Sequence, residues 1–193
     1  MPSPAASKFT FRSMLQRFRR SRCGSAAVEF ALIAPLFFVL LFAIIELALM
    51  FLATQVLETA VQNSARMILT GQAQSGQLPA CPATSSCTTQ QELFKNYVCQ
   101  NSANTLFDCS QLYVDVQSYS NSFASVTLSS HIDSAGNFDP TMNYNPGGSG
   151  QVVVVRLFYQ WPLFVTGLGF NISNLAGNKR LLVATAAFQN EPY

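Results

Sequence analysis

An unbroken apolar run from Phe30 to Ile45 constrains this chain more than any other feature of its sequence. Twelve of its sixteen residues are Leu, Ile, Phe or Val. At about −0.3 to −0.6 kcal/mol for each of these, the run favours membrane insertion by about 4–7 kcal/mol. Between residues 26 and 53 only Glu29 and Glu46 are ionisable, and one acid costs about 2.5–3.5 kcal/mol on the same scale. The run therefore predicts a single transmembrane helix.

The charges are distributed unevenly about this run. Residues 1–24 contain no acidic residue and six basic ones: Lys8, Arg12, Arg17, Arg19, Arg20 and Arg22. The rest of the chain has five basic and nine acidic residues. Basic residues gather at the cytoplasmic end of membrane helices, so we expect the N-terminus in the cytoplasm and the larger C-terminal part beyond the membrane. A basic segment can also bind nucleic acid, but beside a membrane helix it is a topology signal, and we expect no nucleic-acid partner.

The helical rise gives the depth of the polar residues in this helix. With Arg22 at the cytoplasmic headgroups, Glu29 lies about 10 Å inside and Glu46 about 36 Å up, near the outer interface. We therefore interpret Glu46 as an ordinary interfacial acid and expect Glu29 to need a partner inside the inner leaflet. Pro35 removes one backbone hydrogen bond near mid-membrane, which predicts a kink or a loosened turn there.

The junction before the apolar run has a definite order of residue types. Gly24 ends the basic leader, four small or apolar residues follow, and Glu29 and Phe30 open the helix. This order resembles the cleavage site of type IV-like pilins, and the residue types suit the cut that the resemblance implies. Gly24 has no side chain, which lets an extended backbone enter a protease cleft at the membrane surface. A cut between Gly24 and Ser25 would free the α-amino group of Ser25, a cation at neutral pH and a counter-charge for Glu29.

Residues 24–72 resemble known sequences. The junction Gly24–Phe30 resembles the cleavage site of type IV-like pilins, where a prepilin peptidase cuts after the glycine. The longer stretch Gly-Ser-Ala-Ala-Val-Glu-Phe-Ala-Leu-Ile-Ala-Pro-Leu, which begins at Gly24, resembles the start of TadE-like proteins, the pseudopilins of tight-adherence (Flp) pilus systems. Residues 57–66 and 70–72 resemble that family's helix continuation. The resemblance covers the rest of the chain only in outline and does not separate TadE from TadF.

This resemblance implies a minor pilin-like protein that is required for pilus assembly and has no enzymatic activity and no cofactor. It implies removal of a leader, residues 1–24, by cleavage between Gly24 and Ser25, and an assembly role for Glu29 and Phe30. The implied location is the bacterial inner membrane, with the C-terminal domain in the periplasm. The implied partners are the prepilin peptidase, other pilins and pseudopilins, the inner-membrane assembly platform and the lipid bilayer. The alternative is an uncleaved membrane anchor that carries a periplasmic ligand- or protein-binding domain.

The helix is predicted to continue beyond the membrane. Apolar residues recur at helical spacing as far as Ile68, and Gly71 is a suitable C-cap, which predicts a helix over residues 25–70. Residues 92–99 predict a short second helix. Alternating or β-branched residues predict three strands, at residues 112–117, 152–159 and 181–188. Residues 123–128 are a possible fourth strand. We therefore expect an α+β, pilin-like fold, in which a helix within residues 25–72 carries a small antiparallel sheet within residues 73–193.

Four cysteines lie beyond the membrane, where the environment is oxidising: Cys81, Cys87, Cys99 and Cys109. They can form two disulfides in three pairings, of which we favour Cys81–Cys87 with Cys99–Cys109. Zinc binding is the rival interpretation, but Cys-x2-Cys spacing is missing, so we expect no metal site.

The sequence contains few other residues that could form a metal-binding or catalytic site. Asp133, Asn137 and Asp139 around Gly136 partly match a calcium loop, but turn formation explains the same residues and is favoured. His131 is the only histidine, and no constellation of residues supports a catalytic site.

Overall fold

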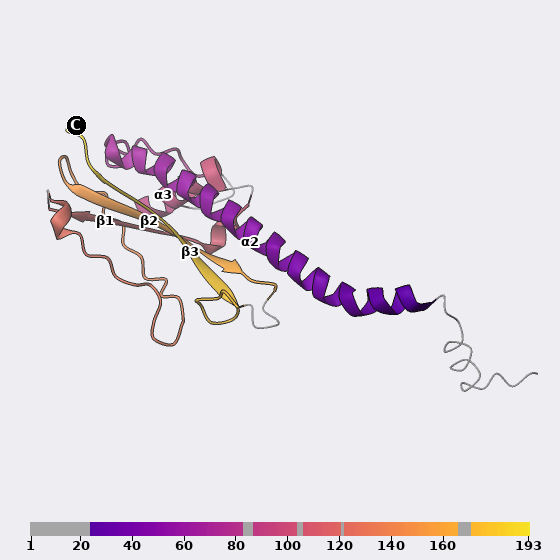
Figure 1. Cartoon of the computed structure of the whole chain (residues 1–193). Coiled ribbons are helices and arrows are strands. Elements are labelled where there is room, and N and C mark those ends of the chain that lie inside the picture. Colours follow the sequence, from indigo (N-terminus) through magenta and orange to yellow (C-terminus); the bar gives the residue numbers. More distant parts are fainter. Residues whose placement is uncertain (1–23, 83–86, 104–105, 121, 166–170) are drawn as a thin grey trace, which may run out of the picture. The chain divides into compact units, whose positions relative to one another are not determined.

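The computed structural model describes residues 24–82, 87–103, 106–120, 122–165 and 171–193. Its main elements are α2 (Ser25–Leu69), α3 (Gln90–Val98), β1 (Leu112–Tyr119), β2 (Val152–Pro162) and β3 (Lys179–Gln189) (Figure 1). The chain divides into two compact units, Met1–Ile44 and Ile45–Tyr193, and the second contains the sheet and the second half of α2. The predicted α+β fold, with a long apolar N-terminal helix and a small antiparallel sheet, is confirmed.

Helix α2 ends through backbone contacts made by a glycine. Gly71 has a φ of +74°, its N–H donates to the carbonyl of Ile68 at 3.0 Å, and the N–H of Ala73 donates to Met67 at 2.9 Å. These bonds satisfy carbonyls that the helix end would otherwise leave unpaired. A Cβ at Gly71 would lie 2.6 Å from the ring of Tyr193. Glycine is therefore needed here both for the backbone conformation and for space.

The sheet has the order β1-β2-β3 and is antiparallel throughout. The second half of α2 packs on one face of it through buried side chains, several of them alanines that allow close approach: Ala53, Leu57, Ala60, Val61, Ala65 and Ile68. Valines and leucines from all three strands complete this core, among them Val114, Val155 and Leu182. The sheet is thus positioned by the amphipathic upper half of α2.

The central strand β2 is buried on both faces. On the face opposite α2, Phe158 of β2 is buried with Leu175 and Leu181 and packs against Ile132 and Phe138, which belong to the segment between β1 and β2. A strand that is covered on both sides needs no polar face. This explains why residues 152–155 are four consecutive valines.

The prediction of a fourth strand over residues 123–128 is wrong. Phe123–Ser125 forms a 3-10 helix, in which the hydroxyl of Ser122 accepts a hydrogen bond from the N–H of Ala124. Such local side-chain bonds compete with strand pairing. Residues 143–145 instead pair with the edge of β1. The N–H of Val116 donates to the carbonyl of Asn143, and the N–H of Asn145 donates to the carbonyl of Val116, both at 2.8 Å.

The segment before β1 is fixed by a capped helix and two disulfides. Thr89 and Glu92 form a capping box at the start of α3, which begins two residues before the predicted position. Disulfides join Cys81 to Cys87 and Cys99 to Cys109, which are the pairs favoured from the sequence. The second disulfide joins the end of α3 to the segment just before β1. It stabilises the fold by lowering the conformational entropy of the unfolded chain.

Candidate functional site

The first half of α2 exposes a continuous apolar surface. Phe30 is 67% exposed, and large apolar side chains remain exposed along this half on every side of the helix, including Leu32, Leu36, Phe37, Leu40 and Phe42. The most apolar 18-residue window of the helix has a mean hydropathy of 2.8, and the helix is long enough to cross a membrane. A surface of this kind is stable in lipid and unfavourable in water. The helix is thus compatible with a single-pass membrane protein.

The predicted cleavage site coincides with the start of this helix. α2 begins at Ser25, and Gly24 precedes it directly. No heavy atom of the described residues lies within 4 Å of a Cβ built at Gly24. The described part of the chain therefore has room for a side chain at this position. Residues 1–23, the rest of the predicted leader, lie outside the described residues.

The other predicted residues of the junction lie on the helix surface. Glu29 and Phe30 are exposed, and Glu29 stands one turn above Ser25 on the same face. Pro35 lies inside α2, which is assigned as one helix from Ser25 to Leu69. Pro35 has no N–H to donate to the carbonyl of Ala31, which is the reason for the predicted kink. The assignment of a single helix does not test this kink, which stays a prediction.

The interpretation of Glu46 as an ordinary interfacial acid is wrong. Its side chain is only 6% exposed. The two carboxylate oxygens accept hydrogen bonds from the backbone N–H groups of Phe164 and Val165, the latter at 3.0 Å. These residues follow β2, so Glu46 fastens the β2–β3 connection to the helix. A buried carboxylate is tolerated here because both of its oxygens have donors.

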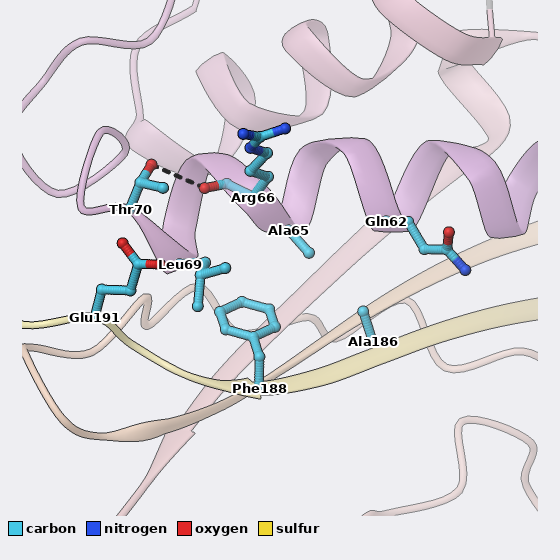
Figure 2. Close-up of a pocket in the computed structure, with 8 residues that line it drawn as sticks. All are labelled: Gln62, Ala65, Arg66, Leu69, Thr70, Ala186, Phe188 and Glu191. Carbon is cyan, nitrogen blue, oxygen red and sulfur yellow. Dashed lines mark hydrogen bonds between the residues drawn. The ribbon is translucent and has the colours of Figure 1, made fainter.

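A groove of about 620 Å³ lies between α2 and the C-terminal end of β3 (Figure 2). Its walls are mixed in character: Gln62, Ala65, Arg66, Leu69, Thr70, Ala186, Phe188 and Glu191. In Figure 2, Phe188 and Ala186 rise from β3 toward the helix. The N–H of Glu191 donates to the carbonyl of Leu69 at 3.0 Å and holds the end of the chain against the helix end. The groove is an open surface feature, and both α2 and the β3 end contribute apolar and polar residues to it.

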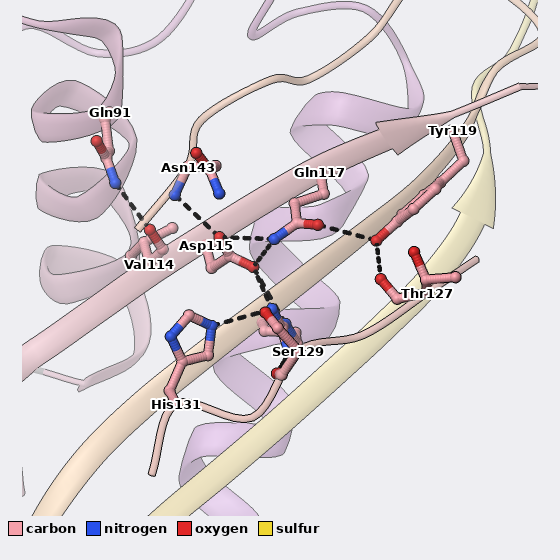
Figure 3. Close-up of polar contacts among 10 residues, drawn as sticks. Gln91, Val114, Asp115, Gln117, Tyr119, Thr127, Ser129, His131 and Asn143 are labelled. Atoms are coloured by element: carbon pink, nitrogen blue, oxygen red, sulfur yellow. Dashed lines mark hydrogen bonds and ion pairs between the residues drawn. The ribbon is translucent and has the colours of Figure 1, made fainter. Parts of the chain in front are cut away.

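A buried polar network crosses the other face of the sheet (Figure 3). Asp115 is fully buried and Arg156 is 5% exposed, and a guanidinium nitrogen lies 2.8 Å from the carboxylate. Asp115 also accepts from the backbone N–H of Asn143 at 2.9 Å and from the side chain of Gln117. Arg156 donates to the carbonyl of Ser129 at 2.9 Å. Each charge is thus compensated, as burial requires.

His131 completes this network. Its Nε2 lies 3.0 Å from a guanidinium nitrogen of Arg156. Arginine can only donate, so Nε2 accepts and the ring proton is on Nδ1. Nδ1 is buried and has no hydrogen-bond partner within the described residues. The ring also contacts Phe158 edge to face, with the centroids 4.7 Å apart.

This network was not predicted, although the sequence contains a signal for it. Asp115 is the single acid and Arg156 the single base in two otherwise uncharged predicted strands. Charges in buried strands are nearly always paired. Asp115 and Arg156 are cross-strand partners in the β1–β2 register. The network ties the segment between β1 and β2 to the sheet, which is a structural role.

Removing one member of this pair should destabilise the domain strongly. We expect Asp115→Ala to lower the free energy of unfolding by about 3–5 kcal/mol, because Arg156 stays buried without its counter-charge. The measurement is urea unfolding of the full chain in detergent micelles, followed by the fluorescence of Trp161, the single tryptophan.

Two further variants control this measurement. Glu58→Ala removes an exposed carboxylate from α2 and should change stability by no more than about 0.5 kcal/mol. Replacing both partners, in Asp115→Leu with Arg156→Met, should cost less than the two single changes together. Equal stability of Asp115→Ala and Glu58→Ala would contradict the buried pair.

The predicted turn around Gly136 is present as a set of local hydrogen bonds. One carboxylate oxygen of Asp133 accepts from the N–H groups of Ala135 and Asn137, at 2.9 and 2.7 Å, and the other accepts from the side chain of Asn137. The bonds from Asn137 hold the pKa of Asp133 below its usual range. Gly136 supplies a φ of +79°. The carboxylate thus closes a turn, as favoured from the sequence.

Comparison with known proteins gives one result, and it falls on the long helix. Residues 24–66 match the family model described as TadE-like protein. No curated protein and no solved structure was found to match the chain. The matched segment begins at Gly24 and ends inside α2, so it contains the junction and the whole exposed apolar surface, while α3 and the sheet lie outside it. The chain is therefore similar to TadE-like proteins over residues 24–66, and this similarity lies in the N-terminal helix.

Proposed function

We propose that this chain is a minor pilin-like (pseudopilin) protein, required for the assembly of tight-adherence (Flp-type) pili. The observation that carries the proposal is the start of the family match at Gly24, directly before an exposed apolar helix. In this proposal α2 spans the bacterial inner membrane, the leader is cytoplasmic and residues 73–193 form the periplasmic domain. The two disulfides fit an oxidising compartment such as the periplasm.

Processing is the first step of the proposed function. A prepilin peptidase removes residues 1–24 by cutting between Gly24 and Ser25. Three observations support this step: the helix begins at Ser25, no neighbouring side chain of the described residues lies within 4 Å of a Cβ at Gly24, and the basic leader ends there. The cut creates an α-amino group one helical turn below Glu29, so that a cation and a carboxylate face each other in a layer of low dielectric constant.

Assembly is the second step. Glu29 and Phe30 lie on the exposed surface of α2, where they meet lipid or the helices of other pilins and of the inner-membrane assembly platform. Within the bilayer such helices associate through packing and polar contacts rather than through the hydrophobic effect. The chain acts as a structural component in this proposal and has no catalytic role.

The mature N-terminus tests the proposal directly. When the chain is expressed with its cognate prepilin peptidase, N-terminal sequencing and intact mass should show a product that begins at Ser25. That product has 169 residues, the 193 of the full chain less the 24 of the leader. Cells without the peptidase should keep the full chain, and a major pilin in the same cells reports that the peptidase is active. Retention of the leader beside an active peptidase would refute the pseudopilin assignment.

One observation favours the alternative, an uncleaved anchor that carries a periplasmic binding domain. The groove between α2 and β3 is open, has a volume of about 620 Å³ and combines the ring of Phe188 with the charged side chains of Arg66 and Glu191. Grooves of this size accept a peptide segment or a small molecule. The same N-terminal analysis separates the two functions, because an anchor keeps its leader.

A further inference from the structure

The β2–β3 connection meets α2 at a level where the helix surface is still apolar. Glu46 lies among exposed apolar residues of the helix, with Ile45 and Leu47 beside it and Leu49, Phe51 and Leu52 one to two turns above it. A hydrocarbon layer of about 30 Å takes about 20 helical residues, so a span that starts at Ala26 reaches the level of Glu46. In the proposed membrane placement, on which this inference rests, Glu46 therefore lies at the outer edge of the bilayer and not beyond it.

The hydrogen bonds to Glu46 fix the depth of the connection. The backbone nitrogens of Phe164 and Val165 are bonded to the carboxylate, so Phe164 must lie within a side-chain length of the helix at this level. Phe164 is 82% exposed, the largest fraction among the large apolar side chains of the described residues, whereas its neighbour Leu163 is buried. An exposed phenylalanine at the edge of a bilayer is stabilised by contact with lipid.

Two features of the same end of the sheet suit a lipid surface. A backbone that enters the interface must have its N–H groups bonded, and Glu46 accepts from two of them. Lys179 and Arg180 begin β3 at this end, where Lys179 pairs with Pro162, two residues before Phe164. Cationic side chains at this height favour the anionic headgroups of phospholipids.

We propose that Phe164 inserts into the outer leaflet of the membrane beside α2. The periplasmic domain then rests on the bilayer at a second point besides its helix, with Glu46 as the anchor of that contact. The occupant of this surface is phospholipid, because the apolar surface of the helix continues on both sides of the same level.

The test uses an environment-sensitive fluorophore at three phenylalanines of the full chain in a Cys23→Ser background. The other four cysteines are joined in disulfides. The labelled variants are Phe164→Cys, Phe38→Cys in the apolar run, and Phe123→Cys as the matched control. Phe123 is an exposed phenylalanine that follows β1 at the opposite end of the sheet, about 30 Å from Phe164 along the strands. The chains are reconstituted in vesicles of phosphatidylcholine and phosphatidylglycerol, with and without a lipid that carries a quencher on its acyl chain.

The expected result is that labels at positions 38 and 164 lose most of their emission to the quenching lipid, while the label at 123 keeps its emission. Quenching at 38 without quenching at 164 would overturn this inference and leave the proposed function intact. Absence of quenching at 38 would overturn the membrane placement and both proposals with it. Equal quenching at 123 and 164 would show that the domain adsorbs nonspecifically, which also overturns the insertion of Phe164.

The role of Glu46 has its own variant. Glu46→Ala is introduced into both the Phe164→Cys chain and the Phe38→Cys chain. It removes both acceptors of the connection, so quenching of the label at position 164 should fall, while quenching of the label at position 38 stays the same. Unchanged quenching at 164 would overturn the anchoring role assigned to Glu46.

Discussion

Gly24→Leu is expected to leave the leader on the chain completely and to abolish pilus assembly. In the proposed function the prepilin peptidase must hold the backbone on both sides of the bond between Gly24 and Ser25, and a branched side chain at the cut position blocks its close approach. Gly24→Ala adds a single methyl group and should be cut more slowly than the wild type but faster than Gly24→Leu. Immunoblots of the processed and unprocessed forms, with electron microscopy of the cells, measure both effects.

The structure provides a matched control for this variant at a second glycine. A Cβ at Gly24 meets no described atom within 4 Å, whereas one at Gly71 would overlap the ring of Tyr193, and Gly71 has a φ of +74°. Gly71→Ala should therefore lower the stability of the domain by about 1 kcal/mol or more without slowing the cut. Gly24→Leu should block the cut and leave Trp161 fluorescence unfolding unchanged. If Gly24→Leu were processed normally, the cleavage site would lie elsewhere.

The helix and the strands could be predicted because their residues carry local signals. The end of α2 is two residues before a glycine that has the conformation of a C-cap, so its position is visible in the sequence. The strands were found through β-branched residues and alternation, and their ends were placed less well. β2 runs to Pro162 rather than to Tyr159, since Gln160 and Trp161 have no apolar pattern but still pair with β3.

The contacts that join distant segments could not be predicted in the same way. Glu46 accepts from backbone N–H groups more than a hundred positions away, and no residue type marks a backbone donor. Asp115 and Arg156 are 41 positions apart, and only the strand register makes them partners. The fourth strand was predicted from an apolar segment whose two large side chains, Phe123 and Leu128, are exposed. Long-range pairing determined the first two outcomes, whereas the local cap at Ser122 favoured a 3-10 helix over the fourth strand.

Glu29→Val is expected to abolish pilus assembly while it leaves membrane insertion intact or improves it. The change removes an acid from the apolar segment, which favours insertion by about 2.5–3.5 kcal/mol, or somewhat less near the interface. A simple membrane anchor would gain from this change. In the proposed function the same change removes the carboxylate that meets an N-terminal amine, on its own chain or on a neighbouring subunit, and assembly is lost.

Two conservative variants separate charge from size at this position. Glu29→Gln keeps the length of the side chain and its hydrogen-bonding groups but loses the charge, so it should also fail to assemble if the partner is a protonated amine. Glu29→Asp keeps the charge on a shorter side chain and should retain part of the assembly. Membrane fractionation after alkaline extraction measures insertion, and recovery of sheared pili measures assembly.

The opposite signs of the two effects make the test specific for Glu29. A variant that simply misfolded would lose insertion and assembly together, and a residue without a role would change neither. Cleavage after Gly24 should be measured in the same cells, because an uncleaved chain has no free amine for Glu29 to meet and would fail to assemble for that reason alone. Normal pili in cells that carry processed Glu29→Val would show that the carboxylate has no part in assembly. The TadE-like junction would then serve the peptidase only, and the contacts that build the fibre would have to come from the exposed surface of α2 above it.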